Sequence, residues 1–344
     1  MSKAFDEAKY LKLQRQKILE RKDMFGKLYL EFGGKLLDDQ HAARCIPGFA
    51  PDLKIRLLEE LKDEAEVILC ISARALQSHK ERADYGISYG EELINEIKAL
   101  KSRGVYVSSV VVTLYEGQQA ADEYLPRVQE YVHNVYTHTP TKGYPMDVDT
   151  IVSDEGYGQN PYIKTTRDLV VVSAPGPCSG KMATALSQLY HESKRGVEAG
   201  YAKFETFPVW NLALKHPLNL AYEAATADLE DVNMIDHYHL AKYDSVATNY
   251  NRDLEIFPVL REILKRTTGK EVYYSPTDMG VNMVGFCITD DKLVREASVN
   301  EVERRYKRAI DDYANGKITE QTLIRTKCLW DDVSQLEKDE GKDE

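Results

Sequence analysis

The sequence predicts an α/β protein with a doubly wound, mostly parallel β-sheet that is followed by a helical segment. Short runs rich in Val, Ile, Leu and Tyr alternate with longer segments of helical periodicity, as in successive βαβ units. One of these runs, Leu169–Ser173, is apolar without alternation, which is typical of a central strand covered by helices on both faces. These two observations give the fold class.

The first part of the chain carries the strands of the predicted sheet. Each apolar run is too short for a typical helix, and the runs are Lys27–Phe32, Glu66–Ser72, Val105–Leu114, Asn134–Thr137 and Leu169–Ser173. Helices are expected between them at Asp52–Leu61, Tyr89–Ser102 and Ala120–Tyr131. Because parallel strands need long crossover connections, which are usually helical, this order favours a parallel sheet.

The pattern changes after residue 200. Residues 201–214 are expected to be extended or irregular, and the charge-free residues 279–289 to form a further buried strand. Helices are expected at Leu218–Ala227, Ile256–Arg266, Lys292–Ala314 and Glu320–Leu336, the last two separated by Gly316. We therefore predict an α/β domain of the phosphate-binding or nucleotide-binding kind at residues 1–289, a helical segment at 290–336 and a frayed acidic tail at 337–344.

Composition limits the class of function. The 344 residues are 43% hydrophobic and 29% charged, as in a soluble globular protein. With 45 Lys and Arg against 56 Asp and Glu, the net charge of −11 argues against nucleic acid and anionic membranes as partners. The five cysteines form no CxxC, so no disulfide framework or structural zinc site is indicated. We expect a cytoplasmic protein.

The most informative motif is a strand, a glycine-containing turn and a helix within residues 169–196, LVVVSAPGPCSGKMATALSQLYHESKRG. This order is typical of a phosphate cradle, where backbone N–H groups and a helix N-terminus face an anion and a lysine adds positive charge. We assign ligand binding to Gly176, Ser179, Gly180, Lys181 and Thr184. The sequence leaves open whether the ligand, or cofactor, is a nucleotide or phosphate. The alternative is a tight turn in which the glycines serve backbone geometry alone.

The motif departs from the common pattern GxxxxGK[ST]. Pro175 takes the place of the first glycine, and Met182 stands where a Ser or Thr would hold magnesium. The motif therefore predicts phosphate binding but not ordinary magnesium-dependent nucleotide hydrolysis. Cys178 lies inside the loop, where the helix end would stabilise a thiolate, but no partner for a nucleophilic role is evident.

Several long segments carry a family resemblance. Besides the loop, these are LYLEFGGKLLDD at 28–39, IVSDEGYG at 151–158, residues 199–236, NYNRDLEIFPVL at 249–260 and SPTDMGVNMVG at 275–285. Together they resemble a bacterial family known as the domain of unknown function numbered eighteen forty-six, over residues 3–315. The resemblance implies no particular reaction. It implies a loop of the form GPGSGKMAT, in which Cys178 replaces the middle glycine, and a further C-terminal α/β domain that this chain lacks.

Polar side chains in the second half supply the catalytic candidates. Lys203 and Glu205 alternate with Phe204, so they project from the same side of an extended segment, either toward a substrate or as an ordinary surface ion pair. The stretch NYNRD at 249–253 is costly to bury unless its groups pair or meet a ligand. We assign catalysis to Glu205, Asp253 and Lys203, with one of the two carboxyl groups as the acid/base, and ligand binding to Arg252 and Asn251. No metal is assigned, because His237 and His239 have no identifiable third ligand.

Two classes of function follow. The first is an enzyme that acts on a nucleotide or another phosphorylated small molecule, such as a transferase or a ligase. The second is a sensor or assembly module that uses the same loop without turnover, which the absence of a magnesium-holding hydroxyl favours. The expected partner is a phosphorylated small molecule, with a homo-oligomer as a further candidate.

Overall fold

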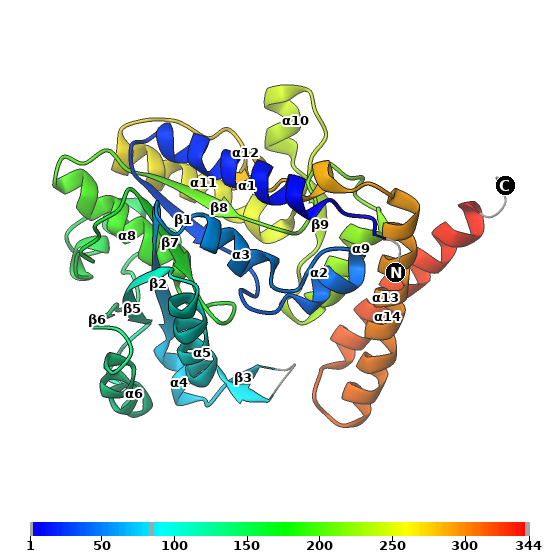
Figure 1. Ribbon diagram of the computed structural model, residues 1–344, viewed down its shortest axis with the longest axis horizontal. Helices are drawn as coiled ribbons and strands as arrows, with labels where there is room; N and C mark the ends of the chain where they lie inside the picture. Colours follow the sequence, from blue (N-terminus) through cyan, green and yellow to red (C-terminus); the bar gives the residue numbers. More distant parts are fainter. Residues whose placement is uncertain (1–2, 83–85, 341–344) are drawn as a thin grey trace.

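The computed structural model describes residues 3–82 and 86–340. Its centre is a seven-stranded sheet of order β11-β8-β1-β7-β2-β5-β6, in which every neighbouring pair is parallel (Figure 1). The strands are β1 (Leu28–Phe32), β2 (Ala65–Ser72), β5 (Tyr106–Thr113), β6 (Asn134–Thr137), β7 (Leu169–Ser173), β8 (Gly200–Phe204) and β11 (Gly280–Val281). The predicted α/β class with a parallel sheet is confirmed.

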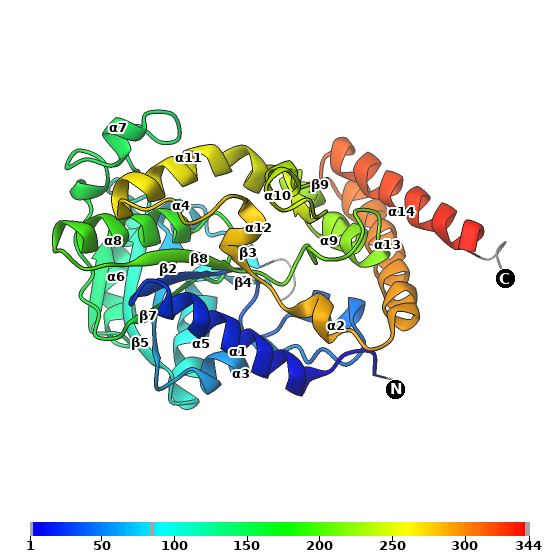
Figure 2. The same ribbon diagram turned by 90° about the horizontal axis from the view of Figure 1, so that it is seen from above.

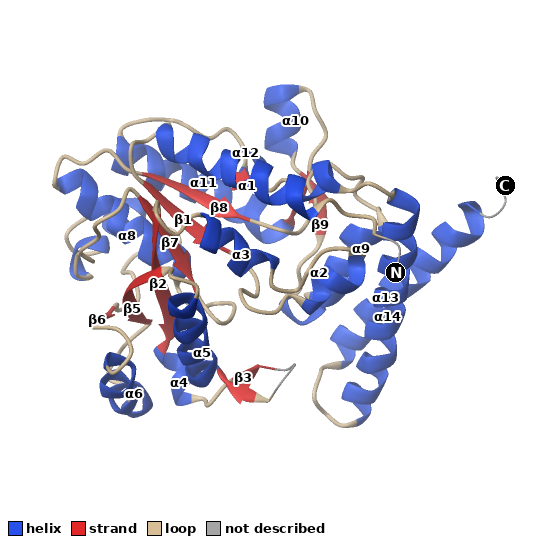
Figure 3. Cartoon of the chain, viewed as in Figure 1, coloured by secondary structure: helices blue, strands red, loops and turns tan. Residues whose placement is uncertain are grey.

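Helices cover both faces of this sheet (Figures 2 and 3). Helices α1 (Glu7–Asp23), α3 (Leu53–Glu60) and α5 (Tyr89–Ser102) lie on one face, and α8 (Lys181–Lys194) and α11 (Asn251–Thr268) lie on the other. The central strands β2 and β7 are consequently buried along their whole length, as the non-alternating apolar run of β7 predicts.

The direction of the chain connections reverses at β7. The connection from β2 runs outward to β5, whereas the connection from β7 crosses β1 in the opposite direction to reach β8. In open parallel sheets, ligands bind beyond the carboxyl ends of the strands at such a switch point. The glycine-containing loop at 174–180 follows β7 and therefore lies at that position.

The remaining elements extend from this core. The other helices before residue 290 are α2 (Gln40–Cys45), α4 (Ala73–Gln77), α6 (Gln119–Gln129), α7 (Val148–Ile151), α9 (Pro217–Ala225), α10 (His237–Tyr243) and α12 (Pro276–Met279). Two small antiparallel pairs join β3 (Glu81–Arg82) to β4 (Ile87–Ser88) and β9 (Asn233–Ile235) to β10 (Thr248–Tyr250). Within the described ranges, no helix combines the length and the apolar composition that crossing a bilayer requires.

The C-terminal part is a helical hairpin, as predicted. Helices α13 (Asp291–Ala314) and α14 (Glu320–Glu340) contact one another and α9, and Gly316 in the turn has a φ of +67°. The helix α14 continues to Glu340, so the residues expected to form a frayed tail are helical up to that point, and 341–344 lie outside the described residues.

One element prediction is wrong. Residues 279–289 do not form a long strand: β11 ends at Val281, and a 3₁₀ turn occupies Val284–Cys287. The side chain of Asn282 explains this turn. Its amide nitrogen donates to the carbonyls of Thr206 and Pro208, and its oxygen accepts from the backbone N–H of Val284. These side-chain hydrogen bonds take the place of the backbone hydrogen bonds that would pair a longer strand with its neighbour.

Candidate functional site

The loop at 174–180 is held against the end of β5 by its last two residues. Gly180 has a φ of +78°, and a Cβ added there would lie 2.8 Å from Oγ1 of Thr113, at the end of β5. The Thr113 hydroxyl donates to the carbonyl of Ser179 at 2.7 Å. Only glycine meets both the left-handed backbone and the close approach. The loops after β7 and β5 are thus adjacent, where the sequence predicts a ligand site.

The assigned loop residues divide into two groups. Lys181 begins α8, and its Nζ lies 3.4 Å from Oγ of Ser179, so these side chains meet at the helix N-terminus. Gly180, the N-cap, supplies no side-chain hydrogen bond to the first N–H groups of α8. Thr184 is buried, and its hydroxyl accepts from the Cys70 thiol at 3.6 Å, so it packs α8 onto β2. Gly176 lies against the ring of Tyr89, where a Cβ would approach to 2.7 Å.

Cys178 is exposed and has a φ of +53°. A non-glycine residue in this left-handed region carries backbone strain of about 1–3 kcal/mol. The strain fits the expectation that the family loop has glycine at this position.

A second group of side chains lies at the end of β8. Lys203 donates to Oδ1 of Asp253 at 2.5 Å, and its Nζ is 3.6 Å from Oε1 of Glu205. The exposed fractions of the three side chains are 11% for Lys203, 7% for Asp253 and 15% for Glu205. Lys203, Glu205 and Asp253, hereafter the Lys203 cluster, therefore form a buried ion-pair group, which disfavours the surface ion-pair alternative for Lys203 and Glu205.

Burial acts on the protonation of the Lys203 cluster. Burial raises the pKa of Glu205 to about 8, with Asp253 adding to the rise and Lys203 opposing it. Burial lowers the pKa of Lys203, but the adjacent Asp253 and Glu205 more than offset this, so its pKa lies well above the ordinary value. Oδ2 of Asp253 is buried without a hydrogen-bond partner, and a protonated Glu205 would supply the missing donor. Near neutral pH, Glu205 carries the shared proton.

Aromatic hydroxyl groups and a further carboxylate extend the Lys203 cluster. Nζ of Lys203 lies 3.4 Å from the Tyr250 hydroxyl, and the Tyr201 hydroxyl donates to Oε2 of Glu31 at 2.5 Å. Glu31 on β1 is in register with Lys203 on one side and with Val172 on the other. Glu31 thus connects the strand that ends in the loop with the strand that carries the cluster.

The loop and the Lys203 cluster share one edge of the sheet without touching. Val172 and Lys203 are two strands apart, which corresponds to about 10 Å. The loop leans toward Thr113 on the far side of β2, away from β8. A ligand that contacts both groups must extend across the ends of β7 and β1.

Arg252 and Asn251 make their hydrogen bonds within the chain. Arg252 binds Asp231 through Nε and Nη2, the latter bond measuring 2.9 Å. Oδ1 of Asn251 accepts from the backbone N–H of Val232 at 2.9 Å, and its amide nitrogen donates to the carbonyl of Glu230. These bonds fasten the first turn of α11 to the segment before β9. The assignment of both residues to ligand binding stays a prediction.

The two histidines considered for metal binding lie in α10. His239 is within 3.1 Å of the Ser275 hydroxyl and 3.8 Å of an Asp278 carboxylate oxygen, while His237 contacts the ring of Tyr238. The part of the chain that the structure describes contains no group of three or more His, Cys, Asp or Glu side chains placed to hold a metal ion.

Glu205 borders a small cavity of about 10 Å³, which has room for about one water molecule. Its lining comprises Glu205, Pro208, Trp210, Thr248, Asn249, Thr277, Gly280 and Asn282. Polar groups from four separate segments therefore reach the cavity beside the proton-carrying carboxyl group.

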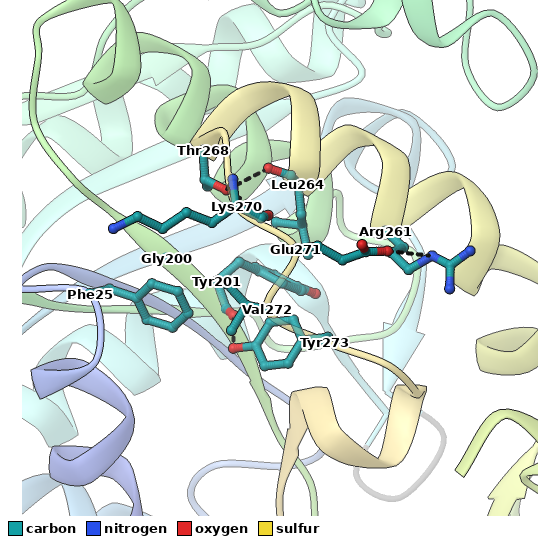
Figure 4. Close-up of a pocket in the computed structure, with 10 residues that line it drawn as sticks. All are labelled: Phe25, Gly200, Tyr201, Arg261, Leu264, Thr268, Lys270, Glu271, Val272 and Tyr273. Carbon is teal, nitrogen blue, oxygen red and sulfur yellow. Dashed lines mark hydrogen bonds and ion pairs between the residues drawn. The ribbon is translucent and has the colours of Figure 1, made fainter. Parts of the chain in front are cut away.

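Two further pockets lie at the opposite edge of the sheet. Figure 4 shows one between the start of β8 and the end of α11, where the Tyr273 hydroxyl donates to the Tyr201 carbonyl and Arg261 lies 3.9 Å from Glu271. A neighbouring cavity of about 200 Å³ shares Phe25 and Lys270 with it. Both pockets are beyond the amino ends of the strands, away from the loop and the Lys203 cluster.

Three residues of the candidate site escaped the sequence reasoning. Tyr201 precedes Lys203 and Glu205 by two and four positions, so strand alternation could have placed it on their face. Tyr250 lies within the NYNRD stretch, and Glu31 is a single charge within the apolar run LYLEF. The sequence around Tyr250 and Glu31 did not indicate their partners, because those partners come from other strands.

Comparison with known proteins gives the family. Residues 3–334 match the family described as "Domain of unknown function DUF1846, N-terminal", which extends past residue 315, where the resemblance was expected to end. A "UPF0371 protein" of Clostridium botulinum is 55% identical over 340 residues, 98% of this chain and 68% of that protein. Similar proteins of the same description occur in Streptococcus thermophilus, 53% identical over 337 residues (98% and 68%), and in Streptococcus pneumoniae, 54% identical over 332 residues (96% and 67%). The chain therefore belongs to the DUF1846 family, whose relatives are described as UPF0371 proteins.

Proposed function

We propose that this chain is an enzyme that binds a nucleotide or another phosphorylated small molecule at the carboxyl edge of its sheet. The observation that carries the proposal is the common edge: the glycine-containing loop at the switch point and the buried Lys203 cluster both lie beyond the carboxyl ends of β7, β1 and β8. One group supplies an anion cradle, and the other supplies a transferable proton.

The phosphate half of the site rests on the start of α8. The first N–H groups of a helix have no partner within the helix, and its N-terminus carries partial positive charge. Gly180 provides no capping side chain to use these N–H groups, and Lys181 adds a full positive charge at the same place. Met182 offers no hydroxyl for magnesium, so charge neutralisation falls to Lys181 and the backbone.

The catalytic half rests on Glu205. A general acid is most effective when its pKa lies near the working pH, and the pKa of Glu205 is raised to about 8. Burial and Asp253 hold the proton on Glu205, and Lys203 balances the charge that remains after its transfer. This arrangement suits a group transfer or ligation in which the phosphate anchors the substrate and Glu205 protonates the group that departs.

A second candidate is a non-catalytic sensor for a phosphorylated metabolite. The observation that favours it is the apolar side chain of Met182, which leaves the loop without the hydroxyl that holds magnesium in common phosphate loops. Both candidates require phosphate at Lys181, and they differ in turnover.

Thermal unfolding with a panel of inorganic phosphate, nucleotides and sugar phosphates tests the shared requirement. The variants are Lys181→Ala and the matched control Lys194→Ala, at the opposite end of α8 with a side chain 60% exposed. At least one compound should raise the midpoint of unfolding in wild type and in the control, and this shift should disappear in Lys181→Ala. Equal shifts in all three proteins would show that the loop with Lys181 does not bind the phosphate.

Turnover separates the enzyme from the sensor. The compound that stabilises the protein is incubated with wild type and Glu205→Gln, and its conversion is followed by mass spectrometry. The enzyme account predicts conversion by wild type, a rate lower by about 10²–10⁴ in Glu205→Gln, and an unchanged thermal shift. Binding without conversion by wild type would favour the sensor.

A further inference from the structure

Three arginines contact a buried carboxylate outside the candidate site. Glu301 on α13 is 2% exposed, and Arg44 from α2 and Arg304 from α13 each bind it through two nitrogens. The four hydrogen bonds measure 2.8, 3.2, 2.7 and 2.8 Å. A carboxylate offers about four lone-pair positions, so these two arginines use its acceptor capacity in full.

Arg305 is the surplus cation of this group. Its Nε is buried and forms an ion pair with Oε1 of Glu301 at 2.9 Å, without the alignment of a hydrogen bond. One of its terminal nitrogens lies 3.3 Å from Nδ1 of His41, whose pKa burial lowers, so the imidazole is neutral near pH 7. The carboxylate of Asp39 opposes this lowering of the His41 pKa, and its Oδ2 is paired with Nζ of Lys54 at 2.7 Å.

The balance of charge leaves this group positive. Three guanidinium groups face one carboxylate, which is a net charge of +2 at neutral pH. Burial lowers the pKa of Arg305, Glu301 opposes this effect, and the neighbouring Arg304 and Arg44 add to it. The side chains of Arg44 and Arg304 are 37% and 41% exposed, so solvent reaches the group from one side.

We propose that Arg44, Arg304 and Arg305 form a second anion site, which takes a phosphate dianion, either free or as the phosphomonoester of a small molecule. A dianion matches the surplus charge of +2, whereas a single carboxylate would leave one cation unmatched. The planar guanidinium groups suit phosphate oxygens, and Arg44 and Arg304 present them partly to solvent.

The arginine site lies near the same edge of the sheet as the phosphate loop. Helix α2 follows the carboxyl end of β1, and it contacts α13 and α9 (Figure 1). The ring of His41 meets that of Phe207 edge-on at 5.1 Å, and Phe207 follows Glu205 by two residues. The proposal goes beyond the function proposed above and stands even if Lys181 binds no ligand.

Calorimetric titration with inorganic phosphate and with a hexose phosphate tests the site in the full chain. All proteins carry Lys181→Ala, which removes the loop's lysine and keeps the two sites distinguishable. Arg305→Gln is compared with Arg308→Gln, a control one turn along α13 whose arginine binds Asp312 at 3.2 Å and is 49% exposed. We expect binding to the parent and the control, and a loss of at least about tenfold in Arg305→Gln.

A conservative variant keeps the test decisive if Arg305→Gln does not fold. Arg305→Lys retains the charge and loses the planar fork, so its affinity should fall by at least about threefold. Tighter binding of the hexose phosphate than of inorganic phosphate would identify an esterified ligand, and equal binding would identify phosphate itself. Undiminished binding by Arg305→Lys, or no phosphate binding by the folded Lys181→Ala parent, would overturn the proposal.

Discussion

At the scale of single residues, the Lys203 cluster is the most constrained part of the molecule. Three ionisable side chains are buried together, and burial of a charge is tolerated only with partners. Lys203 has one carboxylate at 2.5 Å and another at 3.6 Å, and the second carboxyl group, Glu205, holds a proton near neutral pH. The same features that stabilise the cluster make it suitable for proton transfer.

Removing the ammonium group should destabilise the fold strongly. Lys203→Met leaves Asp253 and Glu205 buried without their cation, and breaking a buried pair in this way costs about 3–5 kcal/mol in the free energy of unfolding. Urea denaturation of the variant and wild type measures the difference.

A matched surface lysine gives the comparison. Lys215 lies 3.3 Å from Asp332, with side chains 67% and 48% exposed, so Lys215→Met should cost less than about 1 kcal/mol. Similar losses in the two variants would show that the Lys203 cluster is no more than a solvated ion pair.

Glu205 should make stability fall with rising pH. Its pKa is about 8 in the folded chain against an ordinary 4.5, so between these values the folded state holds the proton and the unfolded state does not. The contribution of Glu205 is complete below pH 4.5 and is lost as the pH rises through 8. Across this window the slope approaches about 1.4 kcal/mol per pH unit.

Glu205→Gln removes the titrating group and retains a hydrogen-bond donor toward Asp253. Urea unfolding at a series of pH values from 5 to 9 should therefore show that the variant gains stability relative to wild type as the pH rises. Parallel stability profiles for the two proteins would show that Glu205 has an ordinary pKa.

At the scale of elements, the unit formed by β7, the loop and α8 carries the proposed anion site. The strand is buried over its full length, the loop passes over the end of β2 to reach Thr113, and α8 begins at Lys181. This path depends on Gly180, which combines a left-handed backbone with a contact that excludes a side chain.

Gly180→Ala should therefore disturb the loop. The new Cβ would lie 2.8 Å from Thr113, and the left-handed backbone adds its own penalty, for a combined cost of about 2–4 kcal/mol. Gly196→Ala, beyond the other end of α8, is the control: its φ is +74°, but no heavy atom lies within 4 Å of the added Cβ. Its cost should be about 1–2 kcal/mol, and equal losses of stability in the two variants would contradict the packing role of Gly180.

Elements were predictable where a local pattern decided them. The alternation of short apolar runs and helical segments predicted β7, β6 and α5 with the observed ends, because burial on one or both faces leaves a periodic signal. The expected strand at 279–289 failed, since Asn282 directs its side chain to carbonyls of a distant segment. Composition alone could not reveal those partners.

The candidate site was predictable only in part, for the same reason. The alternation of Lys203 and Glu205 indicated a pair, but its burial depends on α11, about 50 residues later. The partner of Arg252, Asp231, is brought near by the pairing of β9 with β10. In the arginine site, Arg304 and Arg305 follow Glu301 at helical spacing, whereas Arg44 comes from 257 residues away.

At the scale of the whole molecule, the two edges of the sheet differ in character. The carboxyl edge holds the glycine-containing loop, the Lys203 cluster and, nearby, the three arginines around Glu301, whereas the pockets at the amino edge carry the paired Lys270 and Glu198. The lysine and arginine side chains at the carboxyl edge are accompanied there by the carboxyl groups of Glu205, Asp253 and Glu301.

The five cysteines differ in their exposure to solvent. Cys178 and Cys328 are exposed, and the other three are buried, with burial raising the pKa of Cys70 to about 12 and that of Cys287 to about 11. Labelling of the native protein with a thiol reagent should therefore show two fast thiols and, after denaturation, all five.

A ligand at the loop should slow the labelling of Cys178 and leave that of Cys328 unchanged. Peptide mapping by mass spectrometry identifies each labelled thiol. Fast labelling of a third cysteine in the native protein would contradict the burial described here, and unchanged labelling of Cys178 with saturating ligand would contradict binding at the loop.

Phosphate binding at the start of α8 is tested most directly by a crystal structure of this chain with the phosphorylated compound that stabilises it most. The account predicts phosphate density within hydrogen-bonding distance of the backbone N–H groups at the start of α8 and of Nζ of Lys181, with the rest of the ligand directed across β1 toward Glu205. Density for the phosphate at the amino edge, beside Lys270, with none at Lys181, would contradict the account.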